Sequence, residues 1–405
     1  MANRVTVDPM LSRRMIIKAA IGAGIGAGVG LTNQAHARSY EAYVSAVAAR
    51  LMTAHDIPGL AIGVIKDGDA ETFAFGVASR ETGAAVTPET LFELGSVSKV
   101  YTATLAAIGY TRGRLDWSDP VSRYLPELAD APVGNSTLLD LGTYSAGGLP
   151  LQFPGTVSGL DNAMAFYRSW RPSAVPGSTR QYSNTSVGLF GHAAAAAMRG
   201  DFASLMDREI LQHLGLRDTY TQVPPQAMNN YAWGYDRDGN AVRVNPGVFD
   251  TEAYGLKATA RDVLNFLSLH LAHRNLDPDM RAALGQTMVP RIRIGSMTQC
   301  LGWESYDAPV TLARLLEGNS ASVILRSQPA FPVVGNVAGR QRLFNKTGST
   351  GGFGAYVAFL PDHGIGVAIL ANRNFPIPAR VEAAWQILGG LGNPLARGVT
   401  RRQPD

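Results

Sequence analysis

Residues 354–370, GAYVAFLPDHGIGVAIL, contain the pattern that decides the fold. Two apolar, β-branched runs, Gly354 to Leu360 and Gly366 to Leu370, flank Pro361-Asp362-His363-Gly364, which contains turn-forming residues. This pattern predicts two neighbouring strands joined by a short turn. Apolar residues at helical spacing follow over Ala379 to Leu391, and we expect that helix to pack on the sheet.

A second hairpin is predicted near the other end of the chain. Residues 61–76 contain two apolar runs separated by Asp67-Gly68-Asp69, which favours two strands and a turn. The segments between the two hairpins have mainly helical patterns, over Val97 to Tyr110, Leu138 to Tyr144, Ser186 to Met198 and Ala260 to His273. These features predict an α/β fold. Both chain ends build one antiparallel sheet flanked by helices, and a mainly helical lobe is inserted between them.

Composition excludes several classes of protein. Of the 405 residues, 46% are apolar and 17% are charged, which is too apolar for a disordered chain. The single cysteine, Cys300, excludes internal disulfides and paired-cysteine zinc sites. The formal net charge is +4, but residues 1–37 hold four lysines and arginines against one aspartate. The remaining chain is therefore nearly neutral, unlike a nucleic-acid-binding protein.

Residues 1–37 have the layout of a bacterial export signal. A basic start with Arg13-Arg14 precedes a Gly- and Ala-rich apolar stretch, and Ala35-His36-Ala37 offers a cleavage site. The apolar stretch is short for a membrane span, and an uncleaved anchor is the alternative. The paired arginines resemble a twin-arginine signal, with ordinary Sec export as the other route. We expect a periplasmic protein with one two-lobed domain over residues 38–405.

Three short motifs carry residues suited to nucleophilic chemistry. Ser96 and Lys99 are three apart at a predicted helix start, so the lysine can reach the serine hydroxyl. Tyr182 lies two residues before Asn184 in a predicted loop, and a tyrosine can act as a general base where cations lower its pKa. Lys346-Thr347-Gly348 precedes a predicted strand, and its glycine allows a substrate to approach closely. Taken singly, each motif also fits a structural role as a helix cap, a packing tyrosine or a turn.

Together the three motifs resemble those of the penicillin-recognising serine hydrolases. Their flanking residues are similar to those of class C β-lactamases, and the similarity extends from about Tyr40 to Leu391. The similar segments are 92–96, 144–154, 182–191, 252–255, 346–361 and 378–383. The resemblance implies a β-lactamase and penicillin-binding-protein-like fold with the active site between the two lobes.

The resemblance also implies the catalytic roles. Ser96 is expected to be the acylated nucleophile and Lys99 its proton partner. Tyr182 is the expected base, and Lys346 would favour its phenolate form. The backbone amides of Ser96 and Ser349 would form the oxyanion hole. Whether Tyr182 works alone or shares the role of base with Lys99 stays open.

Further positions are implied to bind substrate. In the family, such positions hold the acylamino side chain of the substrate, lie on a large binding loop, or bind the carboxylate of the substrate. The matching residues are Gln152 and Asn184 for the side chain, Tyr254 on the loop, and Thr347 with Arg380 for the carboxylate. Gly348 and Ser349 of the same motif are also expected to bind substrate. One departure is Ile377, which stands where many members have an asparagine near that carboxylate.

The function implied by the resemblance is hydrolysis of cephalosporins and penicillins through a Ser96 acyl-enzyme, giving antibiotic resistance. No metal or cofactor is expected. The expected partner is the β-lactam itself, with no nucleic acid, no stable membrane association after signal cleavage, and a monomeric state. Two alternatives stay open, an esterase or D-alanyl-D-alanine peptidase of the same superfamily and a penicillin-binding sensor that acylates without turnover.

Overall fold

The computed structural model describes residues 30–271, 276–334 and 341–392, with side chains from residue 40 onward. Residues 1–29 of the predicted export signal lie outside the described residues. Residues 30–37 form the beginning of helix α1, Gly30–His55. Among the described residues, no helix combines the length and apolar character needed to cross a membrane.

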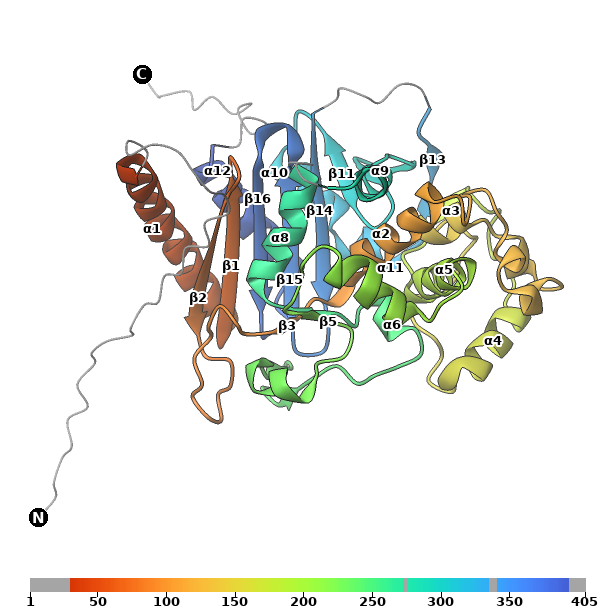
Figure 1. Cartoon of the computed structure of the whole chain (residues 1–405), viewed down its shortest axis with the longest axis horizontal. Helices are drawn as coiled ribbons and strands as arrows, with labels where there is room; N and C mark the ends of the chain where they lie inside the picture. Colours follow the sequence, from red (N-terminus) through yellow and green to blue (C-terminus); the bar gives the residue numbers. More distant parts are fainter. Residues whose placement is uncertain (1–29, 272–275, 335–340, 393–405) are drawn as a thin grey trace, which may run out of the picture.

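Nine strands of the described chain form one antiparallel sheet (Figure 1). Strands from the two chain ends meet where β16 pairs with β1, with Leu60 opposite Ala371 and Lys66 opposite Ile365, which confirms the predicted fold class. In sheet order the strands are β13 (Phe331–Pro332), β9 (Ile292–Ile294), β10 (Met297–Gln299), β11 (Glu304–Asp307), β14 (Arg342–Ser349), β15 (Gly354–Leu360), β16 (Ile365–Ala371), β1 (Gly59–Lys66) and β2 (Asp69–Gly76).

Helices cover both faces of the sheet and form the lobe beside it (Figure 1). Helices α1 and α12 (Ile377–Gly390) pack together on one face, and α8 (Ala260–Leu271) packs on β1 and β16. The remaining helices are α2 (Ser98–Thr111), α3 (Leu138–Gly142), α4 (Gly159–Ser169), α5 (Asn184–Ala197), α6 (Phe202–Leu205), α7 (Asp250–Ala253), α9 (Pro278–Thr287), α10 (Leu312–Gly318) and α11 (Ala321–Leu325).

Short strands and tight helical turns connect these elements. The turn η1 (Gly95–Val97) leads directly into α2, and the π-helical segment η5 (Met206–Gln212) follows α6. The short strand pairs are β3 (Phe92–Glu93) and β5 (Thr219–Tyr220) on β8 (Lys257–Ala258), β4 (Thr179–Arg180) with β12 (Gln328–Pro329), and β6 (Gly234–Tyr235) with β7 (Ala241–Val242).

Side chains alternate along each strand, so the two faces of the sheet bury separate apolar clusters. In β1, Ala61 and Ile65 belong to the core shared with the helical lobe. Leu60, Ile62 and Val64 belong to the cluster under α1 and α12. The sheet is therefore covered on both faces, as the apolar runs in its strands require.

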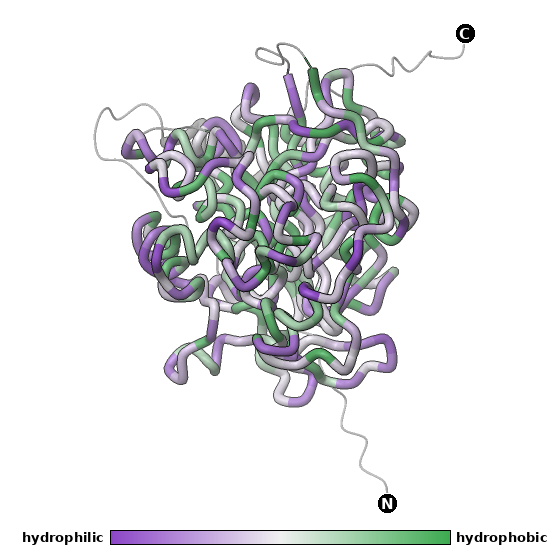
Figure 2. The backbone as a smooth tube through the Cα atoms, turned by 90° about the vertical axis from the view of Figure 1, so that its right-hand side faces the viewer, coloured by the Kyte–Doolittle hydropathy of each residue, from purple (hydrophilic) through white to green (hydrophobic). Residues whose placement is uncertain are grey.

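Helix α2 is the central helix of the lobe. All of its residues from Ser98 to Gly109 are buried, because α5, α7 and α9 pack around it. Figure 2 faces this lobe and shows many of the polar stretches in the outer loops. A helix enclosed in this way holds its first turn, and whatever that turn carries, in a fixed position.

The predicted elements are confirmed with small changes at their ends. The helix predicted over Leu138 to Tyr144 ends at Gly142, and Tyr144 has a φ of 63°, in the left-handed region where a helix cannot continue. The helix predicted over Ala260 to His273 is described to Leu271, and its last two residues lie outside the described chain.

The contact between β1 and α8 requires a glycine, and we predict a specific cost for filling it. A Cβ at Gly63 would lie 2.6 to 2.8 Å from three side-chain carbons of Leu264, which is itself buried. Gly63→Ala should therefore lower the free energy of unfolding by about 1–3 kcal/mol, a typical cost of overpacking. Urea denaturation measures it.

Gly366→Ala is the matched control for this prediction. Gly366 lies opposite Ile65 in the neighbouring strand, and its added Cβ would be 3.5 Å or more from its nearest neighbours. We expect a change within about 0.5 kcal/mol. Equal destabilisation by the two substitutions would contradict the close contact at Gly63.

Candidate active site

Two glycines bring β14 against the turn that carries Ser96. Gly95 has a φ of 51°, and a Cβ on it would lie 2.4 Å from the backbone nitrogen of Ser349. A Cβ on Gly348 would lie 2.0 Å from the carbonyl oxygen of Leu94. Any other residue at these positions would push the strand away from η1. The backbone of the Lys346-Thr347-Gly348 motif therefore lies beside the predicted nucleophile.

The motif occupies a half-open edge of β14. Strand β11 pairs with β14 only from Arg342 to Asn345, whereas β15 pairs with β14 as far as Ser349. Residues 346–349 consequently have a strand partner on one side and the Ser96 turn on the other. Ser96 is partly exposed and Ser349 is exposed, so this edge is open to an incoming ligand.

Lys99 is buried in the first turn of α2 and uses all three of its ammonium hydrogens. Its Nζ donates to Ser96 Oγ at 2.9 Å, to Asn184 Oδ1 at 2.6 Å and to the carbonyl oxygen of Ala253 at 2.6 Å. Burial, together with the charge of Lys346 and against the opposing effect of Tyr182, lowers the pKa of Lys99 to about 8. Lys99 can therefore release a proton near neutral pH.

Tyr182 lies in the loop before α5, which confirms the predicted placement of its motif. The next residue, Ser183, caps α5 by accepting a hydrogen bond from the Ser186 backbone nitrogen at 2.9 Å. The Tyr182 ring packs against Tyr144, with ring centroids 4.8 Å apart. The cap and the ring contact together fix the position of the phenol.

Three cations surround the Tyr182 ring. The ring centroid is 5.0 Å from Lys346 Nζ, 5.2 Å from Lys99 Nζ and 5.3 Å from Arg180 Cζ. Burial alone would raise the pKa of Tyr182, but the charges of Lys346 and Lys99, with the nearby Ser96 hydroxyl, lower it to about 8. No hydrogen bond of ordinary geometry ends on the buried Tyr182 Oη in the described structure. The phenol is thus poised to lose its proton.

A buried ion pair between Arg180 and Glu304 includes one of these cations. Arg180 is fully buried and donates to Glu304 Oε1 at 3.3 Å and to Gln299 Oε1 at 2.9 Å. Glu304 Oε1 is also 3.9 Å from Lys346 Nζ. The motifs did not identify Arg180, Glu304 or Gln299. Only the position of Arg180, two residues before Tyr182, offered a signal.

The residues predicted to bind a substrate carboxylate differ in their burial and in their contacts. Arg380 is fully buried, and its Nη1 donates to the Gly348 carbonyl oxygen at 2.6 Å and to Ser349 Oγ at 2.9 Å. Burial lowers the pKa of Arg380 to about 9. Arg380 therefore contacts the exposed Ser349 rather than solvent, while Thr347 lies on the edge of β14 that β11 leaves unpaired. Ile377, the departure from the family pattern, packs against the apolar cluster under α12.

Of the other predicted positions, Asn184 has a direct contact with the site. Asn184 is buried and holds Lys99, whereas Gln152 is exposed and Tyr254 is half-buried at the end of α7. Of the structure-described residues, no group of three or more His, Cys, Asp and Glu side chains is placed to hold a metal ion. The arrangement is a serine with two neighbouring groups that can accept its proton.

The chain matches known proteins over most of its length. The family model described as "Beta-lactamase" matches residues 44–391. The chain is 44% identical over 342 residues to a β-lactamase of Pseudomonas fluorescens, which covers 84% of this chain and 96% of that protein. It is 41% identical over 343 residues to a β-lactamase of Escherichia coli (strain K12), which covers 84% and 91%.

Solved structures share the fold. A crystal structure titled β-lactamase/D-alanine carboxypeptidase, from Pseudomonas syringae, gives a TM-score of 0.83 at 38% identity and covers 87% of this chain and 99% of that one. The D-alanine carboxypeptidase AmpC from Burkholderia cenocepacia gives 0.82 at 41% identity, with the same coverage. Because the family model and the relatives extend over both the sheet and the lobe that meet at Ser96, the chain belongs to the β-lactamase family of serine hydrolases.

Proposed function

We propose that the chain is a class C β-lactamase that opens the ring of cephalosporins and penicillins through an acyl-enzyme on Ser96. The observation that carries this proposal is the Tyr182 phenol, held among three cations beside the Ser96 and Lys99 pair. A nucleophilic serine needs a base whose pKa is close to the working pH, and Tyr182 and Lys99 both have pKa values of about 8.

In the acylation step, the Tyr182 phenolate takes the proton from Ser96. Ser96 Oγ then attacks the β-lactam carbonyl carbon, a new C–O bond forms, and the ring C–N bond breaks. The proton held by Tyr182 passes to the departing ring nitrogen, so the phenolate is restored. The backbone amides of Ser96 and Ser349 stabilise the negative charge on the carbonyl oxygen, which the close contact of η1 with β14 favours.

Water releases the product in the second step. The same base takes a proton from water, the resulting hydroxide attacks the ester carbonyl, and Ser96 Oγ leaves with that proton. Lys99 is a second candidate for this role, because it bonds directly to Ser96 Oγ at 2.9 Å. Because both groups have pKa values of about 8, separate measurements of the acylation and deacylation rates are the way to assign the base.

D-alanyl-D-alanine peptidase activity is the second candidate function. The two similar solved structures carry the words D-alanine carboxypeptidase in their titles, and a peptidase would use the same serine, lysine and tyrosine. Steady-state hydrolysis of a cephalosporin by the mature protein distinguishes the candidates. Sustained fast turnover supports the β-lactamase, turnover of D-alanyl-D-alanine peptides alone supports the peptidase, and a single stoichiometric burst supports a sensor.

We also propose that the protein acts in the periplasm, where it would confer antibiotic resistance on the cell. The support is the export-signal layout of residues 1–37 with its paired arginines. A periplasmic hydrolase would meet a β-lactam before the drug reached its targets at the cell wall.

The first prediction concerns the nucleophile. Ser96→Ala should lose turnover by about 10⁴-fold or more while the protein stays folded, because the hydroxyl that Lys99 contacts is removed. Cephalosporin hydrolysis gives the rate, and intact-mass spectrometry gives the covalent adduct with a slow substrate. An adduct on the Ser96→Ala protein would show that another residue is acylated.

The second prediction concerns proton transfer by Tyr182. Tyr182→Phe keeps the ring that packs on Tyr144 but removes the ionisable group, so a loss of about 10² to 10⁴ in rate is expected. Rapid-quench mass spectrometry separates acylation from deacylation. If both steps slow, Tyr182 serves both, whereas slow release alone assigns acylation to Lys99. Rates within about threefold of wild type in both steps would rule out the role.

The same variant makes a pH prediction. A general base works when deprotonated, so the acylation rate of the wild type should rise with pH and level off above a pKa of about 8. Tyr182→Phe should remove this rising limb. A limb that persists near pH 8 in the variant would assign the base to Lys99, whose pKa is also about 8.

A further prediction concerns export. Arg13→Lys together with Arg14→Lys preserves charge but removes the paired guanidinium groups, so the protein should stay in the cytoplasm. Cell fractionation followed by a β-lactamase assay measures its location. Undiminished periplasmic activity would assign export to the Sec route.

A further inference from the structure

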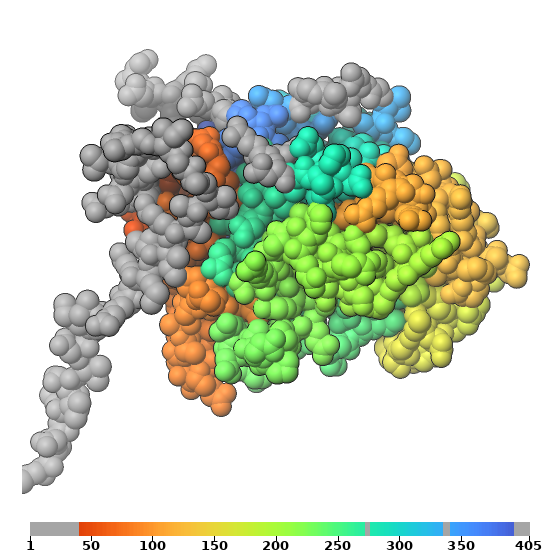
Figure 3. Space-filling view, viewed as in Figure 1, coloured from red at the N-terminus to blue at the C-terminus, as the bar shows by residue number. Residues whose placement is uncertain are grey.

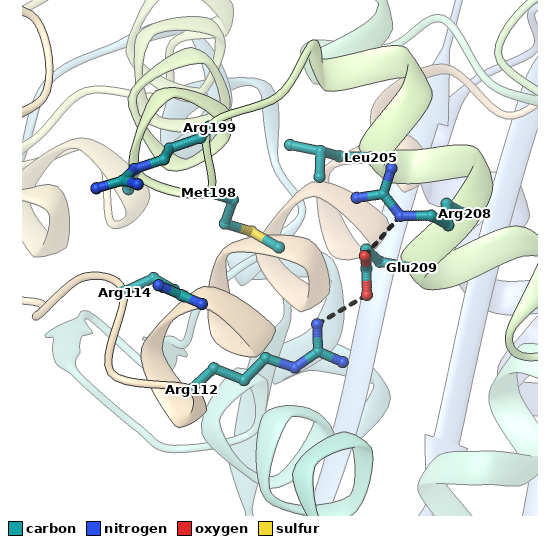
Figure 4. A pocket seen from close by; sticks show the side chains of 8 residues that line it. Arg112, Arg114, Met198, Arg199, Leu205, Arg208 and Glu209 are labelled. Atoms are coloured by element: carbon teal, nitrogen blue, oxygen red, sulfur yellow. Dashed lines mark hydrogen bonds and ion pairs between the residues drawn. The ribbon is translucent and has the colours of Figure 1, made fainter.

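A pocket lined by arginines lies at the opposite end of α2 from Ser96. It forms where the last residues of α2 and α5 meet α6 and η5, and its volume is about 260 Å³ (Figure 4). In Figure 3 the orange segment at the end of α2 meets the green segment of α6 and η5 on the face turned to the viewer. Helix α2 has 14 residues, so the pocket is about 20 Å from the active site.

Four arginines line this pocket, and one carboxylate stands among them. Arg112 Nη1 donates to Glu209 Oε2 at 2.8 Å, and Arg208 Nε donates to Glu209 Oε1 at 2.8 Å. Asp279 approaches Arg112 Nε at 3.4 Å from outside the lining. Even with Asp279 included, these carboxylates leave two positive charges of the pocket uncompensated.

The uncompensated charges belong to Arg114 and Arg199. Figure 4 shows both across Met198 from Glu209, with no dashed line to either. Among the described residues, no ion pair or side-chain hydrogen bond includes Arg114 or Arg199. Both are exposed, so their ten guanidinium N–H donors are open to a ligand.

Helix geometry explains the presence of cations here only in part. Arg114 follows the end of α2, and Arg199 follows Met198, the C-cap of α5, where the helix dipole favours positive charge. An interaction with a helix dipole does not require a pocket. In the described residues, neither guanidinium donates to the carbonyl groups at the ends of α2 and α5. Like charges that line one hollow instead raise the positive potential in it.

We propose that this pocket binds a small, multiply charged phosphate-type anion in solution, separate from the β-lactam site. Guanidinium groups recognise phosphate oxygens with paired, charge-assisted hydrogen bonds, and two unpaired arginines match an anion that carries at least two charges. The volume of about 260 Å³ fits inorganic pyrophosphate rather than a drug-sized ligand. The apolar side chains of Met198 and Leu205 form the wall between the arginines.

Isothermal titration of the full chain with inorganic pyrophosphate, at fixed ionic strength, tests the proposal. Saturable one-to-one binding is expected for the wild type. Arg114→Gln and Arg199→Gln should each weaken binding by about fivefold or more, and the double variant should abolish it, because each loses charge-assisted hydrogen bonds. Arg168→Gln is the control, since Arg168 is an exposed arginine on α4 that does not line the pocket.

Three outcomes would overturn the proposal. They are the absence of saturable binding by the wild type, equal binding by the double variant, and equal weakening by Arg168→Gln. A second experiment measures sedimentation of the protein with vesicles that contain an anionic phospholipid. If the protein binds these vesicles but does not bind pyrophosphate, the ligand is a lipid headgroup and the proposal of a soluble anion is wrong. Cephalosporin turnover by the Arg114 and Arg199 variants should match the wild type, because neither residue contacts the active site.

Discussion

The active site depends on a buried cluster of charge around one phenol. Lys99, Lys346 and Arg180 lie 5.0 to 5.3 Å from the Tyr182 ring, and Glu304 is the carboxylate that contacts two of these cations. Positive charges repel strongly where water is excluded. Burial is the main cause that lowers the pKa of Lys99 to about 8, with the charge of Lys346 adding to it. For Tyr182, the charges of Lys346 and Lys99 outweigh burial and lower the pKa to about 8. In the function that we propose, the cluster itself thereby supplies the base for Ser96.

The same cluster joins the two parts of the molecule. Lys99 comes from the central helix of the lobe, Tyr182 from the loop before α5, and Lys346 and Glu304 from paired strands of the sheet. Removing one partner of a buried ion pair leaves the other charge uncompensated, which typically costs about 3–5 kcal/mol. Arg180, although it contacts no reacting atom, is therefore a residue on which both the stability and the chemistry of the site depend.

Local patterns predicted the parts of the fold that are set by nearby residues. The β1–β2 and β15–β16 hairpins and helices α2 and α5 follow from alternation, turn residues and helical spacing. The pairing of β11 with β14 was not predictable in this way, because Asn345 and Glu304 are distant in sequence and meet only in the folded sheet. The resemblance of the three motifs to a known family implied that a serine, two lysines and a tyrosine would meet. The supporting contacts of Arg180 with Glu304 have no short motif.

Arg380 shows why a residue's contacts matter beyond its match to a family pattern. Its guanidinium donates to Ser349 Oγ at 2.9 Å, which leaves the proton of that hydroxyl available to another acceptor. A hydroxyl that accepts from a cation becomes a stronger donor, because hydrogen bonds in a chain polarise one another. Ile377 packs in the apolar cluster under α12, so we expect the Ser349 hydroxyl to carry the effect of the Arg380 charge to a substrate carboxylate. Carboxylate recognition would then rest on an edge of β14 whose position is fixed by Gly348 against η1.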